Sequence, residues 1–136
     1  MLIGSHFLDE LVQEQKKGNR LGIASICSAH PYVLRAAMQF AREQGSAVLV
    51  ESTCNQVNQF GGYTGMTPQS FVSFVSNIAH KENLDLNQIY LGGDHLGPNV
   101  WQHESAREAM QKYQELRNSS RIEERELQET VKITPP

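Results

Sequence analysis

Three apolar, strand-like runs, each followed by a helical pattern, limit the folds open to this chain more than any other feature. The runs cover residues 21–27, 47–52 and 88–93. Alternating strands and helices predict an α/β protein with a parallel sheet and right-handed crossovers, either doubly wound or a segment of a barrel. A complete barrel of eight units needs about 250 residues. A chain of 136 residues would then hold three βα units, the first part of a barrel, after one N-terminal helix.

Each predicted helix has a residue suited to its first or last turn. These residues are Ser5 and Gly18, Pro31 and Gly45, Thr67 with Pro68, and Ser105 with Glu108. Helical spacing places two apolar sets toward the core, namely Val33, Ala37, Phe40 and Ala41 with Leu34 and Met38 alongside, and Phe71, Phe74, Val75, Ile78 and Ala79. The 47–52 run is nearly all apolar, which is typical of a strand buried on both faces.

Charge and composition exclude some functions. The net charge is -3, and no basic stripe with interleaved aromatic residues suggests nucleic acid as a partner. Residues 1–18 carry five charged side chains, so they predict neither a signal peptide nor a membrane segment, and we expect a cytoplasmic protein. The two cysteines, Cys27 and Cys54, lack the spacing of a zinc-thiolate site and are expected to be small buried apolar residues.

Polar residues follow all three predicted strands, where parallel architectures bring their ligand-binding groups together. These polar residues lie in the last positions of each predicted strand or just after it. They are Ser25, Ser28 and His30 for the first strand, Glu51, Ser52, Thr53 and Asn55 for the second, and Asp94, His95 and Asn99 for the third. Glu51 can orient a ligand or pair with loop amides. Asp94 can transfer a proton and His95 can bind a metal, whereas the structural alternative has Asp94 capping a turn and His95 hydrogen-bonded locally.

The loop at residues 55–65 combines amide side chains with glycines. Asn55, Gln59, Gly61 and Gly62 are its candidate ligand-binding residues, because glycine lets backbone N–H groups approach a phosphate. A turn with self-capping amides explains the same composition.

Histidines give a weaker indication of a divalent-metal site. His30, His95 and His103 would meet near the strand ends if the predicted sheet brings them together. His6 and His80 fall on predicted helices and are expected at the surface.

Three blocks of the sequence resemble the non-catalytic subunit family of class II tagatose-bisphosphate aldolase. They cover residues 27–31, 55–67 and 92–99, and the resemblance extends from about Leu8 to about Leu116. It implies a barrel-forming subunit of galactitol or N-acetylgalactosamine catabolism that supports the activity and stability of a separate catalytic aldolase chain.

The catalytic class II aldolases are a looser analogy. They are zinc-dependent barrels with an Asp-His pair after the third strand, and Asp94-His95 is similar to that pair. The analogy implies an acid at Asp94 and a zinc ligand at His95. The other histidine ligands of those enzymes come from later strands, so the resemblance implies no complete metal site and no cofactor in this chain.

The resemblance ends after Leu116, where residues 117–136 become polar and charged. We therefore expect a barrel domain over 1–116 and a divergent tail, helical or disordered, over 117–136. A frameshift, an early stop or a true short variant would each explain this tail.

Two rival functions remain at the level of sequence. The first is a small zinc-dependent aldolase or lyase acting through Asp94 and His95, with a homo-oligomer supplying the missing ligands. The second is a remnant without a biochemical role. Because three parallel strands leave two open sheet edges, we also expect the chain to be poorly stable unless it associates.

Overall fold

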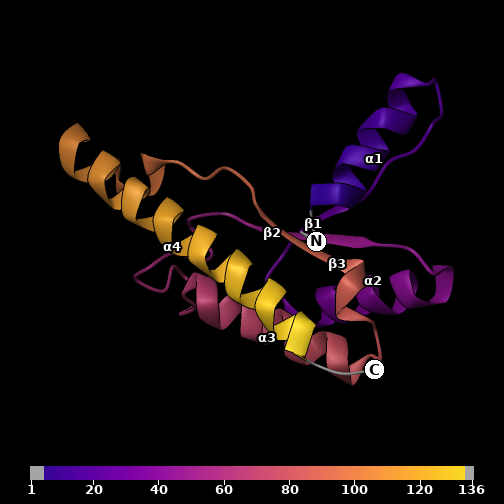
Figure 1. Ribbon diagram of the computed structural model, residues 1–136. Coiled ribbons are helices and arrows are strands. Elements are labelled where there is room, and N and C mark those ends of the chain that lie inside the picture. Colours follow the sequence, from indigo (N-terminus) through magenta and orange to yellow (C-terminus); the bar gives the residue numbers. More distant parts are fainter. Residues whose placement is uncertain (1–4, 134–136) are drawn as a thin grey trace.

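The computed structural model describes residues 5–133, with side chains described for residues 7–119 (Figure 1). Its elements are α1 (Ser5–Lys16), β1 (Ser25–Cys27), α2 (Pro31–Gln44), β2 (Val48–Ser52), α3 (Pro68–Lys81), η1 (Leu86–Gln88), β3 (Ile89–Gly93), η2 (Pro98–Trp101) and α4 (Ala106–Ile133). In the described part, no helix combines the length and apolar character that would cross a bilayer.

The three strands form one parallel sheet in the order β1-β2-β3. This confirms the predicted α/β class and the predicted strand after each of the first three helices. The first strand is shorter than predicted: Ser25 pairs with Leu49, and β2 has no residue before Val48 to pair with the start of the 21–27 run. Leu21, in that run, is 50% exposed.

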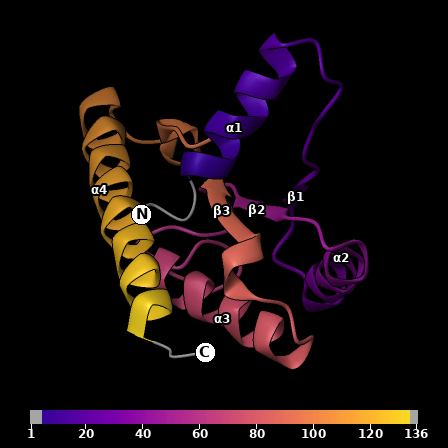
Figure 2. The ribbon, with the colours of Figure 1, turned by 45° about the vertical axis from the view of Figure 1, so that its right-hand side comes forward.

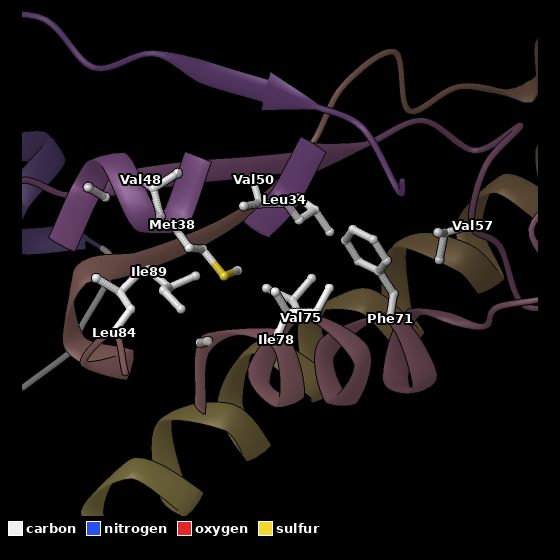
Figure 3. Packing of buried hydrophobic residues seen from close by; sticks show 12 residues of the cluster. Leu34, Met38, Val48, Val50, Val57, Phe71, Val75, Ile78, Leu84 and Ile89 are labelled. Carbon is white, nitrogen blue, oxygen red and sulfur yellow. The ribbon is translucent and has the colours of Figure 1, made fainter. Parts of the chain in front are cut away.

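The main core lies between one face of the sheet and the helices α2 and α3. Figure 3 shows side chains of both helices pointing toward the strands. The cluster includes Val48, Val50 and Ile89 from the sheet, Leu34 and Met38 from α2, and Phe71, Val75 and Ile78 from α3. Burial alternates along β2, where Leu49 and Glu51 are only half-buried. The prediction that this strand is buried on both faces is therefore wrong for the described residues.

Helix α2 faces the core differently from the prediction. Pro31 opens it and Gly45 closes it, as predicted, but its buried residues are Leu34, Met38 and Ala41. The predicted core residues Val33 and Phe40 are 45% and 63% exposed. The helix has two adjacent apolar rows, and in the folded chain the row of Leu34, Met38 and Ala41 faces the sheet.

A carboxylate joins the C-terminal end of α3 to α2. Glu82 accepts hydrogen bonds from Arg35 Nε at 2.5 Å and from Gln39 Nε2 at 2.7 Å, and Arg42 donates to its carbonyl oxygen at 2.7 Å. The bonds from Gln39 and Arg35 hold the pKa of the Glu82 carboxyl below its ordinary value. Glu82 therefore fixes the spacing of the two helices that cover the core.

The opposite face of the sheet carries only α1 among the described elements, which lies across the sheet from α2 and α3 (Figures 1 and 2). Phe7 of α1 stacks on Tyr90 of β3 with a centroid distance of 5.0 Å. Burial, together with the charge of Glu10, raises the pKa of the Tyr90 hydroxyl. The rest of this face, toward the carboxyl ends of the strands, is more open.

Helix α4 begins with the predicted capping box, in which the Ser105 Oγ accepts from the Glu108 N–H at 3.3 Å and Glu108 accepts from the Ser105 N–H at 3.2 Å. Its buried residues Ala109 and Leu116 pack with Trp101 and Cys54 in a second apolar cluster. The backbone stays helical across the predicted boundary after Leu116. Side chains of the predicted tail beyond Ser119 lie outside the described residues, so its divergent character stays a prediction.

Candidate functional site

Three neighbouring strands end in polar side chains that point to the open face of the sheet. Cys27 pairs in register with Glu51, and Glu51 pairs with Gly92. Residues in register across parallel strands share a face, and Ser25, two residues before Cys27, shares it as well. Asp94 follows β3 directly. We name Ser25, Cys27, Glu51 and Asp94 the strand-end cluster.

The carboxylate of Glu51 lies over Gly92. The hydroxyl of Ser25 donates a hydrogen bond to Glu51 Oε2. A methyl group on Gly92 would lie 3.3 Å from both Cγ and Oε1 of Glu51, which is tight for a carbon contact. The absence of a side chain at Gly92 therefore leaves room for this carboxylate to lie across the sheet, so the glycine positions it as much as Ser25 does.

The surroundings of Cys27, including Asp94 and Glu51, raise the pKa of its thiol. Partial burial raises the pKa of this thiol, and the hydrogen bond to Asp94 and the negative charges of Asp94 and Glu51 raise it further. A protonated thiol is a weak nucleophile. Cys27 is exposed, so the prediction that it is a buried apolar residue is wrong; the reason is that its register with Glu51 turns it to the open face.

Asp94 and His95 lie next to each other after β3 but are held differently. The Asp94 N–H donates to the Ser52 carbonyl at 3.0 Å, which holds Asp94 at the end of the sheet. His95 has a left-handed backbone with φ of 49°, and its side chain is 85% exposed with Nε2 3.5 Å from Asp94 Oδ1. Asp94 therefore belongs to the cluster, while His95 makes the local pair that the structural alternative predicted.

Zinc does not fit the described side chains of this single chain. Within residues 7–119 no three histidine, cysteine, aspartate or glutamate side chains are grouped so that they could hold a metal ion. A zinc site needs three or four protein ligands. His30, His95 and His103 do not form the site that the sequence suggested.

Two predicted ligand-binding residues of the first strand end instead serve the helix that follows. His30 caps α2, with Nδ1 accepting from the Tyr32 N–H at 3.3 Å. Ser28 Oγ accepts from the His30 N–H at 3.1 Å. Asn99 lies in η2, where its carbonyl accepts from the Gln102 N–H at 3.1 Å, and its side chain is exposed.

The 55–65 loop uses much of its hydrogen-bonding capacity internally. The N–H groups of Gly61, Gly62 and Tyr63 donate to Asn58 and to the Asn55 carbonyl. Gly62 has φ of 52°, and a methyl group there would meet the Gln56 carbonyl oxygen at 2.4 Å, so only glycine fits. These contacts match the self-capped turn rather than a loop with amides aimed at an anion.

Gln59, the remaining candidate of that loop, connects it to α4. Its Nε2 donates to the Lys112 carbonyl at 2.9 Å. Its Oε1 is buried, and the described residues offer it no hydrogen-bond partner. Lys112 also lies over the Phe60 ring at 5.6 Å, so this contact fixes the loop against the second apolar cluster.

Two further residues position the strand ends and were missed from the sequence. Gln56 is buried, and its Oε1 accepts from the Thr53 N–H at 2.8 Å and lies 3.8 Å from Cys27 Sγ. Cys54 is buried, as predicted, and its Sγ lies 3.3 Å and 3.2 Å from the carbonyl oxygens of His95 and Gly97.

An apolar cavity of about 70 Å³ lies on the covered side of the strand ends. Its lining includes Ser52, Phe71, Leu91 and Leu96. No carboxylate lines it, so it is separate from the strand-end cluster and belongs to the packing of the core.

Comparison with known proteins shows which family the chain belongs to. The model of the GatZ/KbaZ-like D-tagatose-1,6-bisphosphate aldolase subunit family matches residues 8–120. The chain belongs to this family. The GatZ subunit of D-tagatose-1,6-bisphosphate aldolase from Escherichia coli O139:H28 is 56% identical over 106 residues, which are 78% of this chain and 25% of that protein. The resemblance found in the sequence is thus confirmed.

Two other relatives carry different names. The D-tagatose 6-phosphate 4-epimerase of Agrobacterium fabrum is 53% identical over 105 residues, which are 77% of this chain and 25% of that protein. A crystal structure described as a probable tagatose 6 phosphate kinase from Sinorhizobium meliloti is 52% identical with a TM-score of 0.73, over 76% of this chain and 27% of that one. The chain spans about a quarter of the length of the curated relatives that it matches.

Proposed function

We propose that this chain acts as part of a non-catalytic subunit that supports a class II tagatose-bisphosphate aldolase by associating with a separate catalytic chain. The observation that carries the proposal is the 56% identity to the GatZ aldolase subunit across most of the chain. The family match, which includes all three strand ends, supports it.

The strand-end cluster suits the hydroxyl groups of a sugar better than its phosphates. Glu51 and Asp94 are carboxylates, which accept hydrogen bonds from hydroxyl groups and repel phosphate oxygens. Among the described residues no lysine or arginine forms an ion pair with either of them. The names of all three relatives refer to phosphorylated tagatose, so a sugar phosphate is the ligand class that they have in common.

We further infer that the sheet is a segment of a barrel wall. Its three strands follow one another in chain order, as consecutive strands of a barrel wall do. The two crossover helices α2 and α3 pack on the same face of the sheet, as the outer helices of a barrel do. The strand-end cluster would then face the interior at the carboxyl end of the barrel, where barrel enzymes bind ligands.

The test is to add the purified chain to a purified catalytic class II aldolase. We expect the chain alone to cleave neither tagatose nor fructose bisphosphate, and the mixture to keep aldolase activity longer at raised temperature than the aldolase alone. Co-elution of the two chains would show the association. No co-elution and no protection would overturn the proposal.

Variants separate a ligand-facing cluster from a structural one. Asp94→Asn and Glu51→Gln are expected to reduce the stimulation of the aldolase without lowering the melting temperature of the chain. Glu43→Gln, an exposed carboxylate on α2, is the matched control and should change neither. A fall in melting temperature that precedes any loss of stimulation would show that Asp94 and Glu51 serve only the fold. The same reasoning predicts that His95→Gln has little effect on stability.

A second candidate is favoured by the 53% identity to the tagatose 6-phosphate 4-epimerase. In that case the chain would contribute to a site that inverts carbon 4 of tagatose 6-phosphate. Incubation of the chain with tagatose 6-phosphate, without aldolase, followed by chromatographic detection of the C4 epimer, distinguishes this function from the helper role. Epimer formation that is lost in the Glu51→Gln or Asp94→Asn variant would favour the epimerase.

A further inference from the structure

The strand-end cluster accepts hydrogen bonds readily but has few donors to offer. Glu51 and Asp94 are carboxylates, which only accept when they are ionised. The Ser25 hydroxyl already donates to Glu51, and the Cys27 thiol, a weak donor, bonds to Asp94. A sugar hydroxyl both donates and accepts, so a ligand held by these four residues alone would leave hydroxyl lone pairs without a donor. A sugar site therefore needs a donor from outside the cluster.

Gln56 is placed to supply that donor. Its Oε1 lies 3.8 Å from Cys27 Sγ, so its amide group adjoins the cluster, and the residue is only 8% exposed. Its backbone is fixed on both sides, because its N–H donates to the Thr53 carbonyl at 3.0 Å and its own carbonyl accepts from the Thr64 hydroxyl at 2.6 Å. A side chain held in this way loses little conformational freedom when it binds a ligand.

The direction of the Gln56 amide follows from its contact with the backbone. Its Oε1 accepts from the Thr53 N–H at 2.8 Å. A backbone N–H can only donate, so the atom that meets it must be the amide oxygen and not the amide nitrogen. The two N–H groups of Nε2 are therefore left for another acceptor.

The amide nitrogen of Gln56 has no acceptor among residues 7–119, yet it is not buried. Within that part of the chain, the hydrogen bonds of the Gln56 side chain all involve Oε1. The buried side-chain polar atom that lacks a partner there is Gln59 Oε1, so Gln56 Nε2, which also lacks one, keeps contact with solvent. A ligand can use this donor without breaking an existing hydrogen bond.

We propose that Gln56 is a specificity-determining residue of the sugar site, with Nε2 donating to a sugar hydroxyl that itself donates to a carboxylate of the strand-end cluster. This inference rests on the sugar-phosphate ligand class of the proposed function. An amide donor and a carboxylate acceptor together satisfy both halves of a hydroxyl group. Glu51 and Asp94 alone would attract a cationic amine, but an ammonium group has no lone pair for Nε2. Gln56 thereby selects a neutral hydroxyl.

Nuclear magnetic resonance titration of the isotope-labelled chain with tagatose 6-phosphate and with uncharged tagatose tests this role. Gln56→Glu keeps an oxygen for the Thr53 N–H but replaces the donor Nε2 by an acceptor. It should weaken the binding of both sugars by about tenfold, the effect of one lost hydrogen bond together with the repulsion between two acceptors. Gln114→Glu makes the same change at an exposed glutamine of α4. It is the matched control and should bind both sugars as the wild type does.

A second measurement uses the wild-type chain and does not depend on the folding of any variant. The side-chain amide resonances of Gln56 should shift as tagatose 6-phosphate or tagatose is added, while those of Gln114 stay in place. Inorganic phosphate added alone should leave the Gln56 resonances unchanged, because the proposed contact is with a hydroxyl group.

Three results would overturn the proposal. The first is a wild-type chain that shows no saturable binding of either sugar. The second is binding that leaves the Gln56 amide resonances in place or that Gln56→Glu does not weaken. The third is a loss of binding confined to tagatose 6-phosphate, or a shift produced by inorganic phosphate alone, since either would assign Nε2 to the phosphate group. Co-elution with the catalytic aldolase measures the helper function separately, so failure of this proposal and failure of that function are distinguishable.

Discussion

The two faces of the three-stranded sheet differ in what covers them and in what they carry. The face under α2 and α3 presents Val48, Val50 and Ile89 to a continuous apolar core. The opposite face carries Ser25, Cys27 and Glu51 toward the strand ends, and among the described helices α1 packs on it, at Tyr90. Since the same strands supply both faces, the alternation of side chains separates the packed apolar surface from the polar one within a single sheet.

The two faces are expected to differ in how much stability a substitution removes. On the covered face each side chain is packed by two helices, so a change in volume leaves a cavity or forces a shift. On the open face Tyr90 is buried under Phe7, but toward the strand ends Cys27 is exposed and Glu51 is half-buried. A change in volume at those strand-end positions disturbs less packing than a change on the covered face.

The largest expected effect comes from a matched pair of leucines on the two sides of this division. Leu34 is fully buried and Leu49 is half-buried on the open face. Leu34→Ala should lower the free energy of unfolding by about 2–5 kcal/mol, and Leu49→Ala by clearly less. Urea denaturation followed by circular dichroism measures both. Equal losses would mean that the two faces are equally packed in solution.

The next prediction concerns the helix pair that covers the core. Hydrogen bonds from Gln39 and Arg35 lower the pKa of Glu82 from 4.5, so this carboxylate stabilises the fold above pH 4.5 and the stabilisation is lost as pH falls through its folded-state pKa. Glu82→Gln should lower the melting temperature at neutral pH and flatten its decline in acid. Glu43→Gln is the control, and identical acid profiles for both variants would argue against the role of Glu82.

A pair of adjacent glycines tests the division within one strand. A methyl group on Gly93 would lie 2.2 Å from Cδ1 of Leu96, whereas one on Gly92 would lie 3.3 Å from Glu51. Gly93→Ala must displace the exposed side chain of Leu96 and should lower the melting temperature measurably. Gly92→Ala only has to move a flexible carboxylate, and its effect should be smaller. Thermal unfolding measures both variants. A larger fall in melting temperature for Gly92→Ala than for Gly93→Ala would contradict this prediction.

The smallest effect is a change in the reactivity of Cys27. Burial and the hydrogen bond and charge of Asp94 raise the pKa of this thiol, with a smaller contribution from Glu51. Asp94→Asn should therefore shift the pH profile of iodoacetamide alkylation to lower pH, and Glu51→Gln should shift it less. The Cys27→Ser variant reports the background from Cys54. Unchanged alkylation profiles in both variants would show that the two carboxylates do not raise the pKa of the Cys27 thiol.

Local signals predicted the ends of the helices well. Thr67 with Pro68 and Ser105 with Glu108 act within a single turn, so their hydrogen bonds form wherever the helix lies in the fold. The same holds for the stop at Gly45. The apolar face of α2 was predicted too broadly: Leu34, Met38 and Ala41 are buried as predicted, whereas Val33 and Phe40 are exposed. Helical spacing alone does not say which of two adjacent apolar rows meets the sheet.

The candidate site was predicted in part for a related reason. Position at or just after the end of a strand identified Glu51 and Asp94, and the structure brings both to one end of the sheet. Cys27 and Gly92 join them only through the strand register. His30 was predicted at the same place, but its imidazole is used to cap α2, a local bond that competes with any ligand for Nδ1.

The sequence by itself determined the order of strands and helices, the helix ends and the family, because these depend on neighbouring residues and on motifs that stay in one stretch of chain. Only the tertiary structure decided which side of α2 is buried, which histidines are used as caps, and which four side chains form the strand-end cluster. Those outcomes depend on register and on the direction in which each loop turns, and both are settled by contacts between residues far apart in the chain.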